Sequence, residues 1–155
     1  MSPRSSLLRR VAVPLLAVAA AAALCTPTRA ATATLDYCQI VQINNQTGTQ
    51  MAIGERVKCS ITDDSRWQSV TYHAQLLGGG NNLSYTPLPP PGSPPGTPAF
   101  DIWGPGDFYQ PGRYYATSLG PIQHGTYNCW AVCSGPDYYG VPWNASTGGN
   151  TNITY

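Results

Sequence analysis

The stretch GTYNCWAVC (125–133) decides the fold, because small or apolar residues alternate along it with larger or polar ones. The two-residue repeat of a β-strand places Tyr127, Cys129, Ala131 and Cys133 on one face, as a strand against a core requires. Cysteines four apart on a strand have Cα atoms ~13 Å apart, whereas a disulfide needs less than ~7 Å. We therefore expect Cys129 and Cys133 to bond to different, distant cysteines.

Other segments carry the same signal. RVKCSIT (56–62) and SVTYHAQLL (69–77) alternate cleanly, and LDYCQIVQI (35–43) has strand composition. Shorter strands are expected in FDIW (100–103), RYYATSL (113–119) and NTNITY (150–155). Turns are expected at NNQTGT (44–49), DDSR (63–66), Pro111-Gly112 and SGPDYYG (134–140). Six or seven short strands with few helix formers predict an all-β protein, either a sandwich or a barrel.

The segment GGGNNLSYTPLPPPGSPPGTP (78–98) is rich in proline and glycine. Proline fixes φ and lacks the amide proton, so this segment is not expected to form a helix or a central strand. A linker between two domains would leave flanks that are each marginal for folding alone. We expect a long surface loop within one domain, 31–155.

The first thirty residues have the pattern of a secretory signal peptide. Arg4, Arg9 and Arg10 precede an apolar run at 11–24, and small residues follow it up to Ala30. The run is shorter than the ~20 residues of a membrane span. We expect Sec-type export, cleavage after Ala30, and a secreted monomer with no membrane span in the mature chain.

The charge balance changes when this leader is set aside. The full chain has a net charge of +1, but the four basic and seven acidic residues after Ala30 give −3. Without a basic patch, binding to nucleic acid or to anionic lipid is not expected. The expected partner is an extracellular protein or a polysaccharide.

The mature chain holds four cysteines, and an even number in an exported chain indicates two disulfides. Four cysteines allow three connectivities, and their spacing does not choose among them. The four are Cys38, Cys59, Cys129 and Cys133.

Two stretches resemble strands of immunoglobulin domains. GTYNCWA (125–131) resembles the F strand, in which a tyrosine two residues before the second cysteine forms the tyrosine corner. ERVKCSI (55–61) resembles the B strand, and the shared framework extends to residue 155. The resemblance implies an immunoglobulin-like antiparallel β-sandwich in which the Tyr127 hydroxyl locks a corner. Tyr72 would replace the core tryptophan of the family.

The resemblance also implies a disulfide pairing. Cys59 and Cys129 would form the bridge between strands B and F. Cys38 and Cys133 would then tie the first strand to the end of strand F. Each bridge would contribute ~2–4 kcal/mol.

Catalytic and metal-binding patterns are not found in the sequence. The two histidines, His73 and His124, are isolated and are expected at the surface. Asp63-Asp64 suits a turn, and Asp101 and Asp107 suit solvated loops. The cysteine spacing does not favour zinc, and no cofactor is expected.

Aromatic residues give the best functional hint, because exposed rings with few charges around them suit sugars or protein partners. We expect a non-catalytic binding or interaction module. The alternatives are a carbohydrate-binding module, or a small secreted hydrolase or enzyme inhibitor. The candidate ligand-binding residues are Trp103, Trp130, Tyr138, Tyr139 and Trp143. Trp130 is expected either to be exposed or to pack under the 78–98 segment. Four glycosylation sequons occur, at Asn45, Asn82, Asn144 and Asn152.

Overall fold

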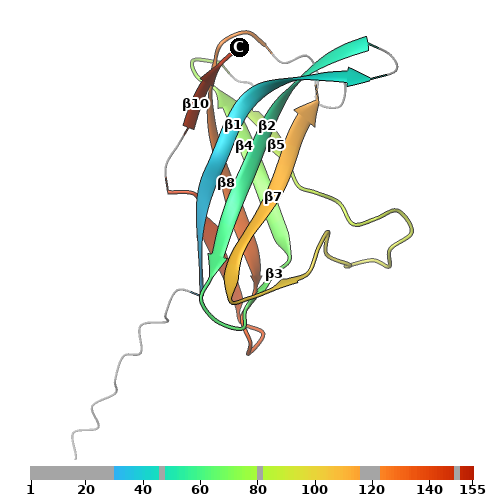
Figure 1. Cartoon of the computed structure of the whole chain (residues 1–155), viewed down its shortest axis with the longest axis vertical. Helices are drawn as coiled ribbons and strands as arrows, with labels where there is room; N and C mark the ends of the chain where they lie inside the picture. The colour runs from blue at the N-terminus through green and yellow to red at the C-terminus, as the bar shows by residue number, and fades with distance from the viewer. Residues whose placement is uncertain (1–29, 46–47, 80–81, 116–122, 149–150) are drawn as a thin grey trace, which may run out of the picture.

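The computed structural model describes residues 30–45, 48–79, 82–115, 123–148 and 151–155. The regular structure in this part of the chain is entirely β (Figure 1), which confirms the expected all-β class. The strands are β1 (Ala31–Asn45), β2 (Gly48–Ile61), β3 (Arg66–Trp67), β4 (Ser69–Leu76), β5 (Asn82–Tyr85), β6 (Ile102–Trp103), β7 (Gly106–Tyr115), β8 (Thr126–Pro136), β9 (Pro142–Ser146) and β10 (Thr151–Thr154). The expected leader lies outside the described residues except for Ala30.

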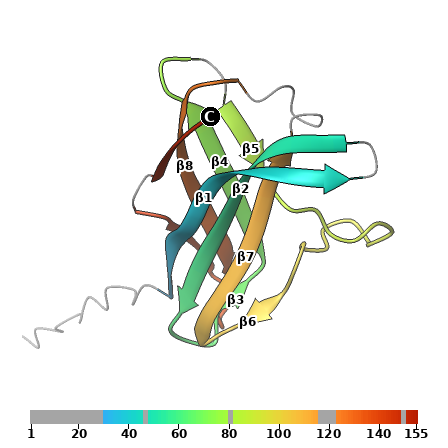
Figure 2. The ribbon, with the colours of Figure 1, turned by 45° about the horizontal axis from the view of Figure 1, so that its top comes forward.

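The strands pair antiparallel in three sheets. The first sheet has the order β1-β2-β7, and the second has the order β10-β8-β4-β5 with β9 also paired to β8. In Figure 1 the first sheet lies in front of the second. The short pair β3-β6 lies at one end of the molecule (Figure 2).

One hydrophobic core contains residues from the two larger sheets. On β8 the predicted inward residues are buried and those between them are only partly buried, which confirms the alternation along 125–133. β4 and the end of β2 follow their predicted patterns as well. The fully buried side chains from these strands include Val57, Cys59, Val70, Tyr72, Ala74, Tyr127, Cys129, Ala131 and Cys133.

Two predictions about prolines need correction. Pro111 does not make a turn but lies inside β7. Because β7 is the edge of its sheet, the missing amide proton of proline costs no ladder bond with a further strand. Within the expected 78–98 loop, Asn82–Tyr85 forms the edge strand β5, since Leu83 is buried between exposed neighbours. Prolines begin only after this strand.

Two further strands were not predicted from the sequence. β3 occupies part of the expected DDSR turn, and β9 occupies a region expected to be loop. Both are too short to show a period, and β9 begins with a proline. The final strand β10 is confirmed as an edge strand on β8. Of the expected strand RYYATSL, residues 116–119 lie outside the described part of the chain.

The predicted disulfide pairing is wrong. Cys38 on β1 bonds to Cys129 on β8, and Cys59 and Cys133 are buried free thiols. The error arises because β1, not β2, brings its cysteine to Cys129. Cys38 lies opposite Glu55 in the β1–β2 ladder, so the position on β2 beside this bridge is a carboxylate.

Two local features fix the second sheet. The Tyr127 hydroxyl donates a 2.9 Å hydrogen bond to the Gln123 carbonyl oxygen, as the expected corner requires. At Gly135 the β8 backbone lies so close to β3 that an added Cβ would stand 1.8 Å from the Arg66 carbonyl oxygen. Only glycine allows this approach, which brings the end of β8 against the fully buried Trp67.

Candidate functional site

A groove of about 590 Å³ lies between the proline-rich segment and the end of the second sheet. We call it the proline groove. Its walls are formed by Gln68, Ser69, Thr86, Pro87, Pro89, Thr97, Pro98, Ala99, Ser134, Gly135, Pro136, Pro142, Trp143 and Asn144. The groove walls come from five separate stretches of the chain that meet only in the fold. The sequence alone therefore predicted no more than a loop for the proline-rich segment.

The walls of the proline groove combine apolar and polar groups but contain no charged residue. None of its wall residues is Lys, Arg, Asp or Glu. Prolines and the indole of Trp143 supply flat apolar surface, while hydroxyl and amide groups lie among them. β9 places Trp143 opposite Gly135 in the ladder with β8, and the half-buried ring also packs against the core. Its position is therefore fixed before any ligand arrives.

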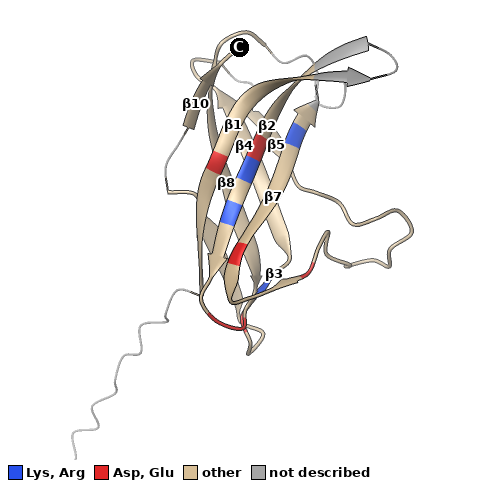
Figure 3. Ribbon diagram, in the orientation of Figure 1, with Lys and Arg blue, Asp and Glu red and all other residues tan. Residues whose placement is uncertain are grey.

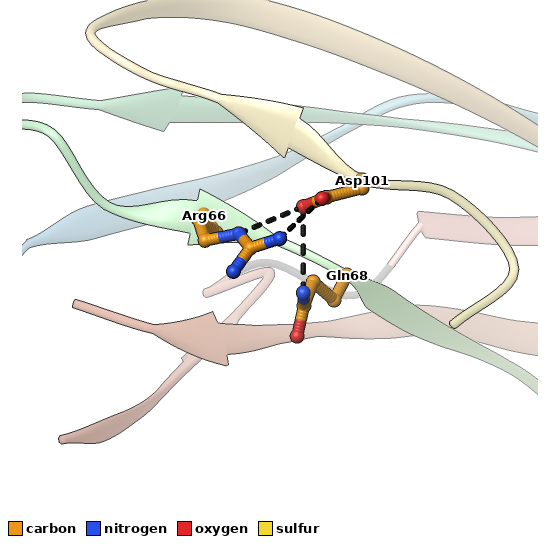
Figure 4. Close-up of polar contacts among 3 residues, drawn as sticks. All are labelled: Arg66, Gln68 and Asp101. Atoms are coloured by element: carbon orange, nitrogen blue, oxygen red, sulfur yellow. Dashed lines mark hydrogen bonds and ion pairs between the residues drawn. The ribbon is translucent and has the colours of Figure 1, made fainter. Parts of the chain in front are cut away.

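A polar clasp holds the far end of the proline-rich segment (Figure 4). Both Arg66 on β3 and Gln68 donate to the carboxylate of Asp101, with Arg66 Nε at 3.0 Å and Gln68 Nε2 at 3.4 Å. The Arg66 guanidinium lowers the pKa of the Asp101 carboxyl. Since Gln68 also lines the proline groove, the clasp connects the groove wall to the returning chain.

Trp103 belongs to this clasp rather than to the groove. The Arg66 guanidinium carbon lies 4.4 Å from the centre of the Trp103 ring, a cation–π contact. The ring is about half exposed, but it is not among the groove walls.

The tip of the β8–β9 hairpin exposes two more of the predicted residues. Tyr138 and Tyr139 are 71% and 86% exposed. The Asp137 carboxylate accepts hydrogen bonds from the backbone N–H groups of Tyr139 and Val141, at 2.9 and 2.8 Å. An ordered turn thus carries both rings next to the proline groove, since Pro136 and Pro142 flank the tip.

Trp130 lies elsewhere, on the outer side of the second sheet. Its ring stacks on His73 with centroids 4.9 Å apart, and it is half-buried. It lines a hollow of about 250 Å³ with the polar residues Gln75, Asn128, Ser146 and Thr147. The structure therefore separates the predicted aromatic residues into the groove with its adjacent tip, the clasp and this outer face.

Charged residues are distributed unevenly over the two larger sheets (Figure 3). They lie on β1, β2 and β7, whereas β4, β5, β8, β9 and β10 contain none. On the first sheet Lys58 pairs with Asp107 at 2.6 Å, and Arg56 pairs with Asp36. The sheet that borders the proline groove therefore offers ligands a surface without formal charge.

Each of the two histidines stacks on an aromatic ring. His73 stacks on Trp130, and burial lowers its pKa. His124 stacks on Tyr155 with centroids 4.3 Å apart. Asp63 accepts a 2.9 Å bond from the backbone N–H of Ser65, as a turn aspartate does.

A group of potential metal ligands lies inside the core. One ligand atom from each of Cys38, Glu55 and Cys129 lies within 4.8 Å of the other two. The two sulfurs are bonded to each other, so a metal ion would require reduction of the bridge first. The Glu55 carboxyl is fully buried, both of its oxygens lack a hydrogen-bond partner, and burial raises its pKa to about 9. The Tyr114 hydroxyl lies beside the Glu55 carboxyl and lowers the pKa of that carboxyl in part. The two groups do not have the geometry of a normal hydrogen bond.

Comparisons with known proteins support the fold alone. Neither a scan against protein-family models nor a search of curated proteins gives a match. Among solved structures, the chain is similar to the X-ray structure of Northeast Structural Genomics Consortium target SoR45, with a TM-score of 0.52 and 8% identity. The alignment covers 81% of this chain and 87% of that one. Within the described residues, no helix is long and apolar enough to span a membrane.

Proposed function

We propose that the chain is a secreted, non-catalytic binding module with an immunoglobulin-like β-sandwich framework, and that it binds a neutral glycan chain in the proline groove. The observation that carries this proposal is the composition of the groove walls, which combine Trp143 and proline rings with amide and hydroxyl groups and lack charge. Sugar rings present apolar C–H faces and a rim of hydroxyl groups, and these walls complement both.

The framework part of the proposal rests on two observations. Two antiparallel sheets contribute to one core, as in a β-sandwich. Tyr127 makes the corner hydrogen bond to the backbone upstream. The departure from an immunoglobulin domain is the bridge, which starts from Cys38 instead of Cys59.

Binding of wild-type protein to insoluble cellulose, chitin and starch, followed by titration with soluble oligomers of the glycan that binds, tests the ligand class. Replacing Trp143 by Ala removes the apolar platform. A truncated aromatic anchor typically costs ~2 kcal/mol or more, which corresponds to a loss of affinity of about thirtyfold or more. Trp143→Phe should retain part of the affinity because a ring remains.

The matched control is Tyr109→Ala, which removes an exposed ring from the charged first sheet. It should leave glycan affinity unchanged. The proposal fails if no neutral glycan binds, or if Trp143→Ala and Tyr109→Ala bind as the wild type does.

A second candidate, a protein partner, is favoured by the exposed tyrosines at the hairpin tip. Tyrosine is enriched at the energetic centres of protein interfaces. If Tyr138→Ala and Tyr139→Ala abolish capture of a secreted partner but leave glycan binding intact, the tip is a separate protein-binding site.

A further inference from the structure

Two cysteines remain in the core beside the Cys38–Cys129 bridge. Cys59 comes from β2 and Cys133 from β8, and both are fully buried. Their side chains are close enough for the Cys59 thiol to act on the Cys133 thiol across the two sheets. This interaction, together with burial, raises the pKa of Cys133.

The strand register explains why these two thiols meet. Glu55, which lies opposite Cys38 in the β1–β2 ladder, is four residues before Cys59 on β2. Likewise Cys129 is four residues before Cys133 on β8. The arrowheads of β2 and β8 point toward the same end of the molecule (Figure 1). The same step of ~13 Å along both strands therefore leads from the existing bridge to the thiol pair.

We propose that Cys59 and Cys133 form a second disulfide, which links β2 to β8 beside the link from β1 to β8. Both β1 and β2 would then be tied covalently to β8. No other cysteine competes within the described part of the chain, since Cys38 and Cys129 are already bonded to each other.

The oxidation is balanced by thiol–disulfide exchange with an external disulfide, either a small molecule or a protein. One cysteine thiolate attacks the external disulfide and releases its first thiolate, which leaves a mixed disulfide. The second cysteine thiolate then attacks the mixed disulfide and releases the other thiolate. The chain loses two electrons and the two thiol protons, and the oxidant leaves as two thiols.

Burial determines when this step occurs. The attacking species is the thiolate, which is scarce in a buried apolar site. An external disulfide also cannot reach sulfurs that have no exposed surface. We therefore expect the second bridge to close while the chain folds and to resist reduction afterwards.

The test is a disulfide map of the protein secreted from an oxidising host. The protein is denatured, its free thiols are alkylated, and its peptides are identified by mass spectrometry without reduction. The expected result is two cross-linked peptide pairs, Cys38–Cys129 and Cys59–Cys133, with no alkylation at these positions. Alkylated Cys59 and Cys133, or any other pairing, would overturn the proposal.

A pair of variants separates the second bridge from the first. Cys38→Ala/Cys129→Ala should retain the Cys59–Cys133 cross-link, because Cys59 comes from β2 rather than β1 and Cys133 lies four residues beyond Cys129 on β8. Cys59→Ala/Cys133→Ala should retain the first bridge and unfold at a lower denaturant concentration. If that second variant has the wild-type midpoint and the wild type contains alkylated thiols, the second bridge does not exist. Neither result depends on glycan binding.

Discussion

The buried carboxyl of Glu55 makes stability depend on pH in a way that one substitution should remove. Burial raises its pKa from 4.5 to about 9 in the folded chain. Below 4.5 the group is protonated in both states and has no effect on the pH dependence. Between these two values the unfolded chain releases the proton while the folded chain keeps it, so stability falls as pH rises.

The magnitude follows from the width of this range. One pH unit corresponds to ~1.4 kcal/mol for one proton. Ionisation of Glu55 in the unfolded chain therefore lowers the free energy of unfolding by about 3 kcal/mol between pH 4.5 and pH 7. Glu55→Gln has no proton to release, so its unfolding free energy should lack this slope. The stability of the variant relative to wild type should increase by ~1.4 kcal/mol for each unit between pH 5 and pH 8.

The assay is urea unfolding followed by tryptophan fluorescence, at several pH values and without reductant. The difference in unfolding free energy between wild type and Glu55→Gln cancels the contribution of other titratable groups. His73 is one such group, because its lowered pKa makes stability rise with pH through the acidic part of the range. Parallel pH profiles for wild type and Glu55→Gln would refute the argument that the carboxyl is buried without a partner.

Three further variants test the local contacts. Gly135→Ala should lower the melting temperature strongly, because its Cβ would overlap the Arg66 carbonyl oxygen, whereas Gly148→Ala has no atom within 4 Å of the added Cβ and should melt as wild type. Tyr127→Phe should cost about 1 kcal/mol in urea unfolding, the typical contribution of one hydrogen bond, and an unchanged free energy would contradict the corner. Arg66→Ala breaks the exposed pair with Asp101 and should weaken glycan binding with little change in melting temperature, so unchanged affinity would exclude the clasp from the site.

Period-two alternation was sufficient to predict β4, β8 and the end of β2, because one face of each is buried and a shift by one residue would expose it. Tyr127 is an example, since the alternation along β8 predicts its buried side correctly. Pro111 was misread because the choice between a turn and an edge strand depends on whether another strand lies alongside.

The disulfide pairing and the proline groove could not be derived in this way. Which cysteine meets Cys129 depends on the placement of β1 against β8, and no local pattern encodes this. The groove arises where the proline-rich segment returns to the sheet. Its path is set by the long-range pair between Arg66 and Asp101. Trp143 was identified as a candidate by residue type alone, and its neighbours became known only from the structure.

The most direct test of the account is to map the backbone amide NMR shifts of the protein during titration with the glycan oligomer that binds. The account predicts that the shifted amides belong to the walls of the proline groove, with Trp143 and Gln68 among them. Shifts confined to the outer face around Trp130, or to the charged sheet of β1, β2 and β7, would contradict it.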